Sequence, residues 1–414
     1  MKRFARLFVL AVVLPALLAA ADVLAAEIVI GFSGPLSGPA GEYGQDCVNG
    51  IDMAIREIND GGGLVLKGRR YTFRLERRDD RVDPKTALGN ARELRGAHRA
   101  IAVFNPVTQT LTPMMAVNEE RNNEFLVMAY SSVPQVSETG NRLLVAITVP
   151  FTTYVMTEAD VAWEKGWRRG AMVVTAGAYG EGWRKTFADV WTKKGGIITA
   201  DYPTNYYKKT EFSAPLTAAL GTDPDFLLIG GPSATTALII EQARAQGFEG
   251  GFVLTDQVNL DAVYQLMAKP LGLEGAVGVC MLSHIAYPAT DAFKSNYKRA
   301  YKRNPTWESI LNYMGMYALA GAVLISQTAD DVTAIRAAFP KVFPMLGDRY
   351  PMEVFGLSSG GRFIVSSSLQ TVRHGRMTPP TNYIWWAQTA REFNVIKKIT
   401  KSDIPPVWKK ISGR

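Results

Sequence analysis

Residues 27–63 read EIVIGFSGPLSGPAGEYGQDCVNGIDMAIREINDGGG. The stretch opens with a short apolar and β-branched run, Glu27 to Ser33, which predicts a buried strand. A loop rich in glycine and proline follows. Apolar residues then recur at helical spacing, at Val48, Ile51, Ile55 and Ile58. Because Asn59 to Gly63 is a strong helix stop, the stretch predicts a strand, a loop and a helix in succession.

The same alternation continues to about residue 282. The predicted strands are Glu27 to Ser33, Tyr71 to Arg78, Ala100 to Phe104, Phe125 to Ala129, Leu143 to Thr148, Ala171 to Thr175, Gly196 to Tyr202, Phe226 to Ile229, Phe252 to Leu254 and Ala276 to Met281. Alternating strands and helices predict parallel sheets covered by helices on both faces. These strands are too many for one sheet of this kind, so two doubly wound lobes are expected.

The remainder of the chain has a different pattern and must complete sheets that were begun earlier. The predicted helices are Asp291 to Arg303, Glu308 to Gln327 and Asp331 to Phe339. The predicted short strands are Glu353 to Phe355, Arg362 to Ser368, Tyr383 to Trp386 and Asn394 to Lys398.

Length and composition suit an ordinary globular protein with two domains, since the chain has 414 residues of which 47% are hydrophobic and 20% charged. It contains only three histidines and two cysteines. A dedicated His/Cys metal centre is therefore excluded, and no cofactor is expected.

The N-terminus has the features of an export signal over residues 1–26. A basic start is followed by an apolar run from Leu7 to Ala21, and small residues suit cleavage near Ala25 or Ala26. The apolar run is too short to span a membrane, and no later segment is expected to span one. Without Lys2, Arg3, Arg6 and Asp22, the net charge falls from +8 to +6.

Two glycine-rich motifs could carry phosphate-binding or catalytic chemistry. The loop from Gly31 to Gly41 lacks the GxGxxG and GxxxxGK[ST] spacings, and its prolines remove amide donors, so it is expected to form a pocket wall. Gly356 to Gly360 fits GxSxG around Ser358, but the β-branched run after it predicts a strand-to-strand turn rather than a nucleophile elbow.

Other candidate groups have a structural and a functional interpretation. The carboxylates Asp79, Asp80 and Asp83 could form an acid/base pair or a cation site, but helix capping and turn formation explain them better. Asp256 follows a short apolar strand at the end where parallel sheets bind ligands, and it could equally cap the helix near Asn259. The basic C-terminus, residues 399–414, is expected to be a solvated and loosely ordered tail.

Several motifs occur in an order that resembles the periplasmic branched-chain amino-acid-binding family, the type I solute-binding components of ABC importers. The motifs are Gly34-Pro35-Leu36-Ser37-Gly38 with Tyr43-Gly44, Ile58-Asn59 with a glycine run, Asp79-Asp80 with Asp83-Pro84-Lys85, Ala178-Tyr179-Gly180-Glu181-Gly182, Thr210 to Ser213, Gly230-Gly231, and Gln242-Ala243-Arg244 with Gly247. The resemblance covers nearly the whole mature chain, up to about residue 398.

The resemblance implies two lobes that are joined by three chain crossings and close on a ligand. The first lobe is expected at residues 27–147 with 283–355, and the second at 148–282 with 356–398. In relatives with a first-lobe disulfide, the cysteines match Val82 and Val107 of this chain. Cys47 and Cys280 are therefore expected to be free thiols.

The resemblance also implies a ligand site. The hydroxyl that binds the ligand carboxylate falls on Thr108, a second polar contact on Ser131 or Ser132, and the acid that binds the α-ammonium on Asp256. Tyr43 and Tyr179 match aromatic positions that cover the ligand. Pro232 stands where some relatives carry an aromatic residue.

These observations predict a monomeric periplasmic receptor, not an enzyme, that captures a small amino acid and presents it to an inner-membrane ABC permease. An alternative is the same fold binding an aromatic or short carboxylate or amide, which does not need Asp256. A rival from another class is an exported α/β hydrolase that uses Ser358. No nucleic-acid partner is expected.

Overall fold

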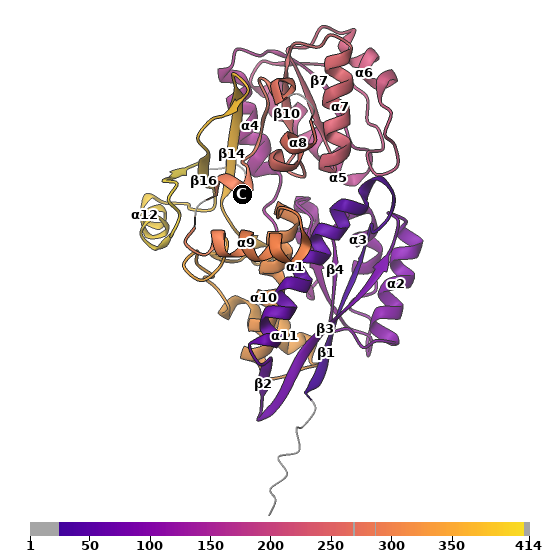
Figure 1. Cartoon of the computed structure of the whole chain (residues 1–414), viewed down its shortest axis with the longest axis vertical. Coiled ribbons are helices and arrows are strands. Elements are labelled where there is room, and N and C mark those ends of the chain that lie inside the picture. Colours follow the sequence, from indigo (N-terminus) through magenta and orange to yellow (C-terminus); the bar gives the residue numbers. More distant parts are fainter. Residues whose placement is uncertain (1–24, 268–269, 286, 410–414) are drawn as a thin grey trace, which may run out of the picture.

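A computed structural model describes residues 25–267, 270–285 and 287–409. Two α/β bodies lie end to end along the long axis of the molecule (Figure 1). One is built on a six-stranded sheet and the other on a nine-stranded sheet. The fold is therefore the predicted one, α/β with two doubly wound lobes.

The six-stranded sheet has the order β2-β3-β1-β4-β5-β6. Its strands are β1 (Ala26–Gly34), β2 (Leu64–Leu66), β3 (Arg69–Asp79), β4 (Ala102–Asn105), β5 (Leu126–Ala129) and β6 (Leu144–Ala146). All neighbours pair in parallel except β2 and β3. Strands β4, β5 and β6 are buried at every residue, as expected for a parallel sheet covered on both faces.

The nine-stranded sheet has the order β17-β16-β14-β11-β10-β9-β7-β8, and β15 pairs with β14. Its strands are β7 (Arg169–Val174), β8 (Ile197–Asp201), β9 (Phe226–Gly230), β10 (Gly251–Leu254), β11 (Val277–Val279), β14 (Ser367–Arg373), β15 (Arg376–Met377), β16 (Thr381–Ile384) and β17 (Pro406–Trp408). Strand β14 is antiparallel to β11, so the late strands complete this sheet. A separate hairpin joins β12 (Gly356–Leu357) and β13 (Phe363–Ile364).

Helices cover both sheets. They are α1 (Gly41–Asp60), α2 (Pro84–Gly96), α3 (Thr108–Met115), α4 (Thr152–Glu164), α5 (Ala178–Lys193), α6 (Ser213–Leu220), α7 (Ser233–Ala245), α8 (Leu260–Leu266), α9 (Thr290–Tyr301), α10 (Trp307–Ser326), α11 (Val332–Ala338) and α12 (Ala390–Ile399). After β11 the chain returns to the first body, where α10 packs along α1. It then passes back to β14, so the chain runs between the two bodies three times.

Most predicted elements are confirmed, and the errors lie late in the chain. Residues 394–398 belong to α12 rather than to a strand, because Thr389 caps a helix by accepting a hydrogen bond from the Glu392 amide at 3.2 Å. The strand predicted at 353–355 is reduced to one bridge between Met345 and Val354. The tail is also more ordered than expected, since β17 pairs in parallel with β16.

Helix α10 is the segment on which the expectation that no later segment spans a membrane depends. It is 20 residues long and apolar enough to cross a membrane by length and composition. However, 72% of its apolar window is buried inside the structure, where it packs against α1. Its apolar character therefore fits a core helix of the first body.

The two cysteines, Cys47 and Cys280, are buried and free, as predicted. Almost all of the predicted export signal, residues 1–24, lies outside the described residues, as do residues 410–414 of the basic tail.

Candidate functional site

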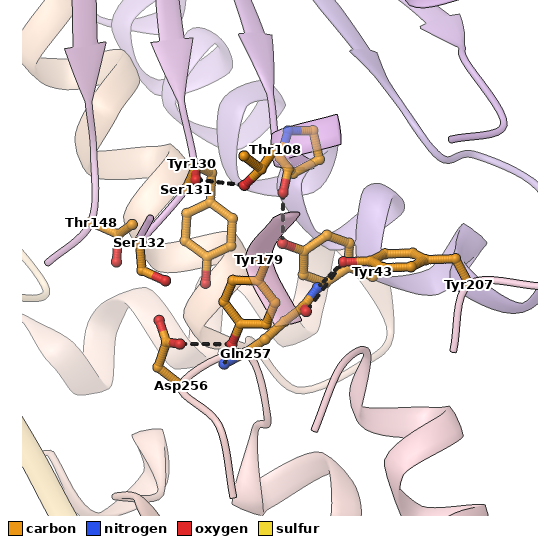
Figure 2. Close-up of a pocket in the computed structure, with 11 residues that line it drawn as sticks. Tyr43, Thr108, Tyr130, Ser131, Ser132, Thr148, Tyr179, Tyr207, Asp256 and Gln257 are labelled. Atoms are coloured by element: carbon orange, nitrogen blue, oxygen red, sulfur yellow. Dashed lines mark hydrogen bonds between the residues drawn. The ribbon is translucent and has the colours of Figure 1, made fainter. Parts of the chain in front are cut away.

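A pocket lies between the two bodies, at the carboxyl ends of strands from both sheets (Figure 2). We call it the cleft pocket. It is lined by Tyr43, Pro106, Thr108, Tyr130, Ser131, Ser132, Thr148, Tyr179, Tyr207, Asp256 and Gln257. Among these residues there is one acid and no lysine, arginine or histidine. The pocket therefore offers many hydroxyl groups, one carboxyl group and no fixed positive charge.

The first body contributes paired hydroxyls to the pocket. Thr108 is the first residue of α3, directly after β4, and Ser131 follows β5. Their side-chain oxygens lie 2.8 Å apart, and both residues are buried. The residue that caps α3, Val107, has no side-chain acceptor, so the first amides of the helix lack a side-chain cap. Hydroxyls beside a helix N-terminus form a suitable site for a carboxylate.

The second body contributes Asp256, which follows β10. One of its carboxyl oxygens accepts hydrogen bonds from the Tyr179 hydroxyl and the Trp183 indole, both at 2.7 Å. Burial raises the pKa of Asp256, whereas hydrogen bonds from Ser132, Tyr179 and Trp183 oppose that rise. A ligand cation at this carboxyl group would stabilise its ionised form.

Two of the four pocket tyrosines are positioned by the same local arrangement, one in each body. Tyr43 and Tyr179 lie in the first turns of α1 and α5, and each is followed by a glycine. A Cβ atom on Gly44 would lie 1.7 Å from the Pro35 carbonyl oxygen, and one on Gly180 would lie 1.7 Å from that of Thr175. Only glycine allows the helix to approach the preceding loop this closely.

Arg362 anchors the first-body side of the pocket from behind. Its buried guanidinium group donates to the backbone carbonyls of Ser131 at 2.7 Å, Thr148 at 3.0 Å and Val133 at 2.7 Å. Two of these three residues line the cleft pocket. Arg362 lies where the chain passes between the bodies for the third time. It therefore holds the loop at Ser131, in the first body, next to Thr148, where the chain passes between the bodies for the first time.

The two bodies also touch beside the pocket. The side-chain amide of Asn259 donates to the Glu308 carboxyl group at 2.5 Å, and the Trp307 amide donates to the Asn259 side-chain oxygen at 2.8 Å. Burial raises the pKa of Glu308 to about 8, with a further contribution from the charge of Asp46.

Six of the seven residues predicted for the site line the cleft pocket. They are Tyr43, Thr108, Ser131, Ser132, Tyr179 and Asp256. The seventh, Pro232, precedes α7 and borders a different cavity. The loop from Gly31 to Gly41 does not line the cleft pocket, but its Pro39 lines the cavity that Pro232 also borders, so the loop does form part of a pocket wall. Asp79 holds this loop in place, because its carboxyl group accepts a hydrogen bond from the Leu36 amide at 3.0 Å.

The structure also decides between several open alternatives. Asn259, not Asp256, is the capping residue of α8, so the interpretation of Asp256 as a helix cap is wrong. Asp83 caps α2 by accepting from the Thr86 amide at 2.7 Å, and Asp80 is buried with Ser33 and Asn105. Both groups are therefore structural.

Ser358 lies in the turn of the β12–β13 hairpin, where its side chain accepts from the Arg362 amide at 3.0 Å. No helix follows it directly, so the nucleophile elbow that the hydrolase alternative requires is not formed. Within the described residues, no cluster of three or more His, Cys, Asp or Glu side chains is arranged to hold a metal ion.

Five pocket residues were missed by sequence reasoning, among them Pro106, which directly follows β4. Tyr130 and Thr148 follow β5 and β6, and Gln257 adjoins Asp256, so their place at strand ends could have indicated them. Tyr207 lies in a loop before α6 and reaches the pocket by accepting from the Gln257 side-chain amide at 2.9 Å. No local signal marks Tyr207.

A second acid, Glu158 on α4, lies near Asp256 and is completely buried. Neither of its carboxyl oxygens has a hydrogen-bond partner among the described residues. Burial, followed by the charge of Asp256, raises its pKa well above the ordinary value of 4.5. Glu158 therefore stays protonated in the folded protein over a pH range in which the unfolded chain has lost that proton.

This burial predicts a pH-dependent cost to stability. Because the folded state holds the proton more tightly, stability falls as pH rises above about 4.5, by up to ~1.4 kcal/mol per pH unit, until the folded-state pKa is reached. Glu158→Gln is expected to remove this contribution. Denaturant unfolding from pH 4 to 8 should show the variant gaining stability over the parent as pH rises. Glu164→Gln, exposed at the end of the same helix, is the control and should show no gain.

Comparison with known families agrees with this geometry. Residues 27–355 match the family model described as periplasmic binding protein. The Leu/Ile/Val-binding protein of Escherichia coli K12 is 26% identical over 231 residues, which is 56% of this chain and 61% of that protein. The leucine-specific-binding protein of Salmonella typhimurium is 24% identical over 315 residues, 75% of this chain and 77% of that protein. The match thus covers about three fifths of the first of these relatives.

Solved structures share the fold. A leucine binding protein, LivK, from Thermotoga maritima has a TM-score of 0.72 at 20% identity over 85% of this chain and 97% of its own. LivJ of Streptococcus pneumoniae, solved with isoleucine, has a TM-score of 0.72 at 20% identity over 86% and 99%. A solute-binding protein of R. palustris, solved with benzoate, has a TM-score of 0.70 at 17% identity over 86% and 95%.

Proposed function

The chain belongs to the periplasmic binding protein family, and on that premise we propose that it captures a small amino acid between its two bodies. The relatives of this chain are solute-binding receptors, not enzymes. The proposed receptor works in the periplasm after cleavage near Ala25 or Ala26. As a monomer it delivers the ligand to an inner-membrane permease of an ABC importer.

One observation favours an amino acid over a plain carboxylic acid as the ligand. The hydroxyls of Thr108 and Ser131 face Asp256 across a pocket whose described walls contain no basic side chain. A zwitterion satisfies both ends, with its carboxylate at the hydroxyls and the α3 N-terminus and its ammonium at Asp256. A plain carboxylate would bring a negative charge near Asp256 with nothing to compensate it.

We further propose that the bodies are lobes that close on the ligand. The first lobe comprises residues 27–147 with 283–355, and the second comprises residues 148–282 with 356–398. The three passages of the chain between them serve as the hinge. The contact between Asn259 and Glu308 then belongs to the closed state, because it joins a residue of the second lobe to one of the first.

A calorimetric screen with matched ligand pairs tests the proposal. Each L-amino acid is compared with the acid that lacks its ammonium group, for example leucine with 4-methylpentanoate. The amino acid is expected to bind and its des-amino partner to bind at least tenfold more weakly. At 100 times its dissociation constant, the ligand should stabilise the protein by about 2.7 kcal/mol. If the carboxylates bind and the amino acids do not, the alternative of an aromatic or short carboxylate ligand replaces the proposal.

Thr108→Ala should weaken binding of the amino acid by about 1.5–3 kcal/mol, the usual contribution of a hydrogen bond to a charged group. The melting temperature without ligand should change little. Isothermal titration calorimetry measures the effect. Thr112→Ala is the control, since its hydroxyl is on the same helix but bonds only the Thr108 carbonyl, and it should bind normally. Equal affinity of Thr108→Ala and the parent would remove Thr108 from the site.

A further inference from the structure

The interface between the two bodies contains a buried carboxyl group. Glu308 lies in the first turn of α10 and is only 2% exposed. One of its oxygens accepts a hydrogen bond from the Asn259 side-chain amide, and the other accepts one from the Tyr130 hydroxyl at 3.4 Å. The Asn259 side-chain oxygen is already engaged by the Trp307 amide, so Asn259 turns its own amide group toward Glu308. Both partners of the Glu308 carboxyl group are therefore neutral.

No basic side chain compensates a charge on Glu308. The guanidinium group of Arg303 pairs with Glu42 and with Asp46, the latter at 3.3 Å, so two other acids engage it. In the part of the chain that the structure describes, no lysine, arginine or histidine lies within ion-pair distance of Glu308. An ionised carboxylate is costly in such a place, because it loses its hydration and gains no opposite charge.

The groups that face Glu308 add no positive charge either. They are Tyr43, Asp46 and Cys47 on α1, Tyr130 after β5, Thr306 before α10, and Tyr207 and Asn259 on the second body. The charge of Asp46 disfavours ionisation of Glu308, whereas hydrogen bonds from Thr306 and Asn259 favour it. Burial is the largest effect, and the pKa of Glu308 is therefore raised to about 8.

Separation of the two bodies would bring water to Glu308. The cavity that Pro232 borders lies along their interface, and its lining includes Asp46 and Glu308 from one body and Pro232 and Asn259 from the other. Asn259 donates to Glu308 only while the bodies are in contact. When Asn259 withdraws, solvent takes its place and hydrates the ionised carboxylate. Glu308 is therefore dry when the bodies are together and hydrated when they are apart.

From this geometry we propose that closure of the two bodies on a ligand takes up one proton, and that Glu308 receives it. The inference rests on the proposed function, since it requires bodies that open and close. The proton comes from solvent and binds a carboxyl oxygen, so no charge is left on Glu308. Tyr130 connects this site to the ligand, because it contacts Glu308 and also lines the cleft pocket. Protons and ligand then favour the same closed state, and each strengthens the binding of the other.

The pH dependence of ligand binding has a definite sign. In the open state, hydrated Glu308 is expected to ionise near the ordinary value of 4.5, whereas in the closed state its pKa is about 8. Ligand affinity is therefore highest at low pH. It falls by up to about tenfold per pH unit as pH rises between these two values, and it levels off above about pH 8. A free amino acid stays zwitterionic in this range, so the ligand itself contributes no titration.

The test counts protons by isothermal titration calorimetry in phosphate and in imidazole buffer at pH 7. The probe is L-leucine, replaced by the tightest-binding amino acid of the screen if leucine does not bind. The dependence of the binding heat on the ionisation enthalpy of the buffer gives the number of protons taken up. The parent protein is expected to take up close to one proton per ligand, and its Kd should rise about tenfold or more from pH 6 to pH 8.

Glu308→Gln keeps an oxygen that can accept from Asn259 and is neutral at every pH. It should take up about one proton fewer than the parent, and its Kd should stay nearly constant from pH 6 to pH 8. Glu57→Gln is the matched control. Glu57 lies on α1, and its carboxyl group accepts hydrogen bonds from the hydroxyls of Tyr313 and Tyr317 in the same body. This variant should keep the proton count and the pH profile of the parent.

The inference is overturned if the ligand binds to the parent without proton uptake, or if Glu308→Gln takes up as many protons as the parent. If Glu308→Gln does not fold, as judged by circular dichroism, Asp46→Asn decides. Loss of the Asp46 charge lowers the closed-state pKa of Glu308, so uptake should decrease at pH 8 and persist at pH 6. Loss of uptake at both pH values would make Asp46 the acceptor and exclude Glu308. If no amino acid binds at all, the proposed function fails, and the inference fails with it.

Discussion

Asp256→Asn is expected to weaken binding of an amino-acid ligand by about 2–5 kcal/mol, roughly 30-fold to several thousand-fold in Kd. Asparagine keeps the shape of the side chain and can still accept from Tyr179 and Trp183, whose bonds to Asp256 are both 2.7 Å long. It cannot compensate the charge of a buried ammonium group. The loss therefore measures the charge partnership rather than a collapse of the pocket. Isothermal titration calorimetry at pH 7 gives the value.

The sign of the change separates the two ligand classes. For a plain carboxylate, the substitution removes an unfavourable neighbour and should leave binding unchanged or tighten it. Tighter binding of the native ligand would therefore exclude the amino-acid proposal while leaving the fold unaffected. Asp201→Asn is the matched control, because Asp201 is an acid of the same body at the end of β8, where it pairs with Arg184 outside the pocket. The Asp201→Asn variant should bind the ligand with the same affinity as the parent protein.

The sequence predicts those pocket residues whose position follows from the sheet topology. Thr108, Ser131 and Asp256 each come directly after a short apolar strand, and parallel strands bring their carboxyl ends to one edge. The structure brings all three residues into one pocket although up to 148 positions separate them. The Tyr-Gly pairs at Tyr43 and Tyr179 could also be recognised in the sequence. In each pair the glycine lies where a backbone carbonyl group comes too close for a side chain.

The sequence interpretation failed where two local signals competed. In residues 390–399 the run Asn394-Val395-Ile396 favours a strand, and Thr389 followed by Glu392 favours a helix start. The helix forms because Thr389 caps it and Ile396 and Phe393 pack against Trp408. That packing depends on β17, which was expected to be loosely ordered. A tertiary contact therefore decided a choice that local propensity left open.

Arg362 shows a different limit of sequence reasoning. Arginine side chains are mostly exposed in proteins, yet Arg362 is only 3% exposed. Its partners are backbone carbonyls of Ser131, Val133 and Thr148, more than 200 positions away. Carbonyl groups are present at every residue, so no pattern of side chains can reveal such a partnership. Only the fold shows that this cation braces the loop that carries Ser131.

Arg362→Met is expected to destabilise the protein by about 2–4 kcal/mol and to weaken ligand binding at the same time. Methionine keeps much of the apolar stem but leaves three buried carbonyl groups without their shared donor. Because Ser131 and Thr148 line the cleft pocket, the loosened loop should also hold the ligand less well. Denaturant unfolding measures the first effect, and calorimetry on the folded variant measures the second.

Arg336→Met separates the bracing role from the general cost of removing a half-buried arginine. The Arg336 side chain also donates to a backbone carbonyl, that of Leu144 at 2.8 Å, and burial lowers its pKa. However, Leu144 does not line the cleft pocket. This variant should lose about 1 kcal/mol of stability and keep the parent affinity. If both variants bind ligand as the parent does, Arg362 supports the fold alone, and the geometry of Ser131 must be maintained by its bond to Thr108.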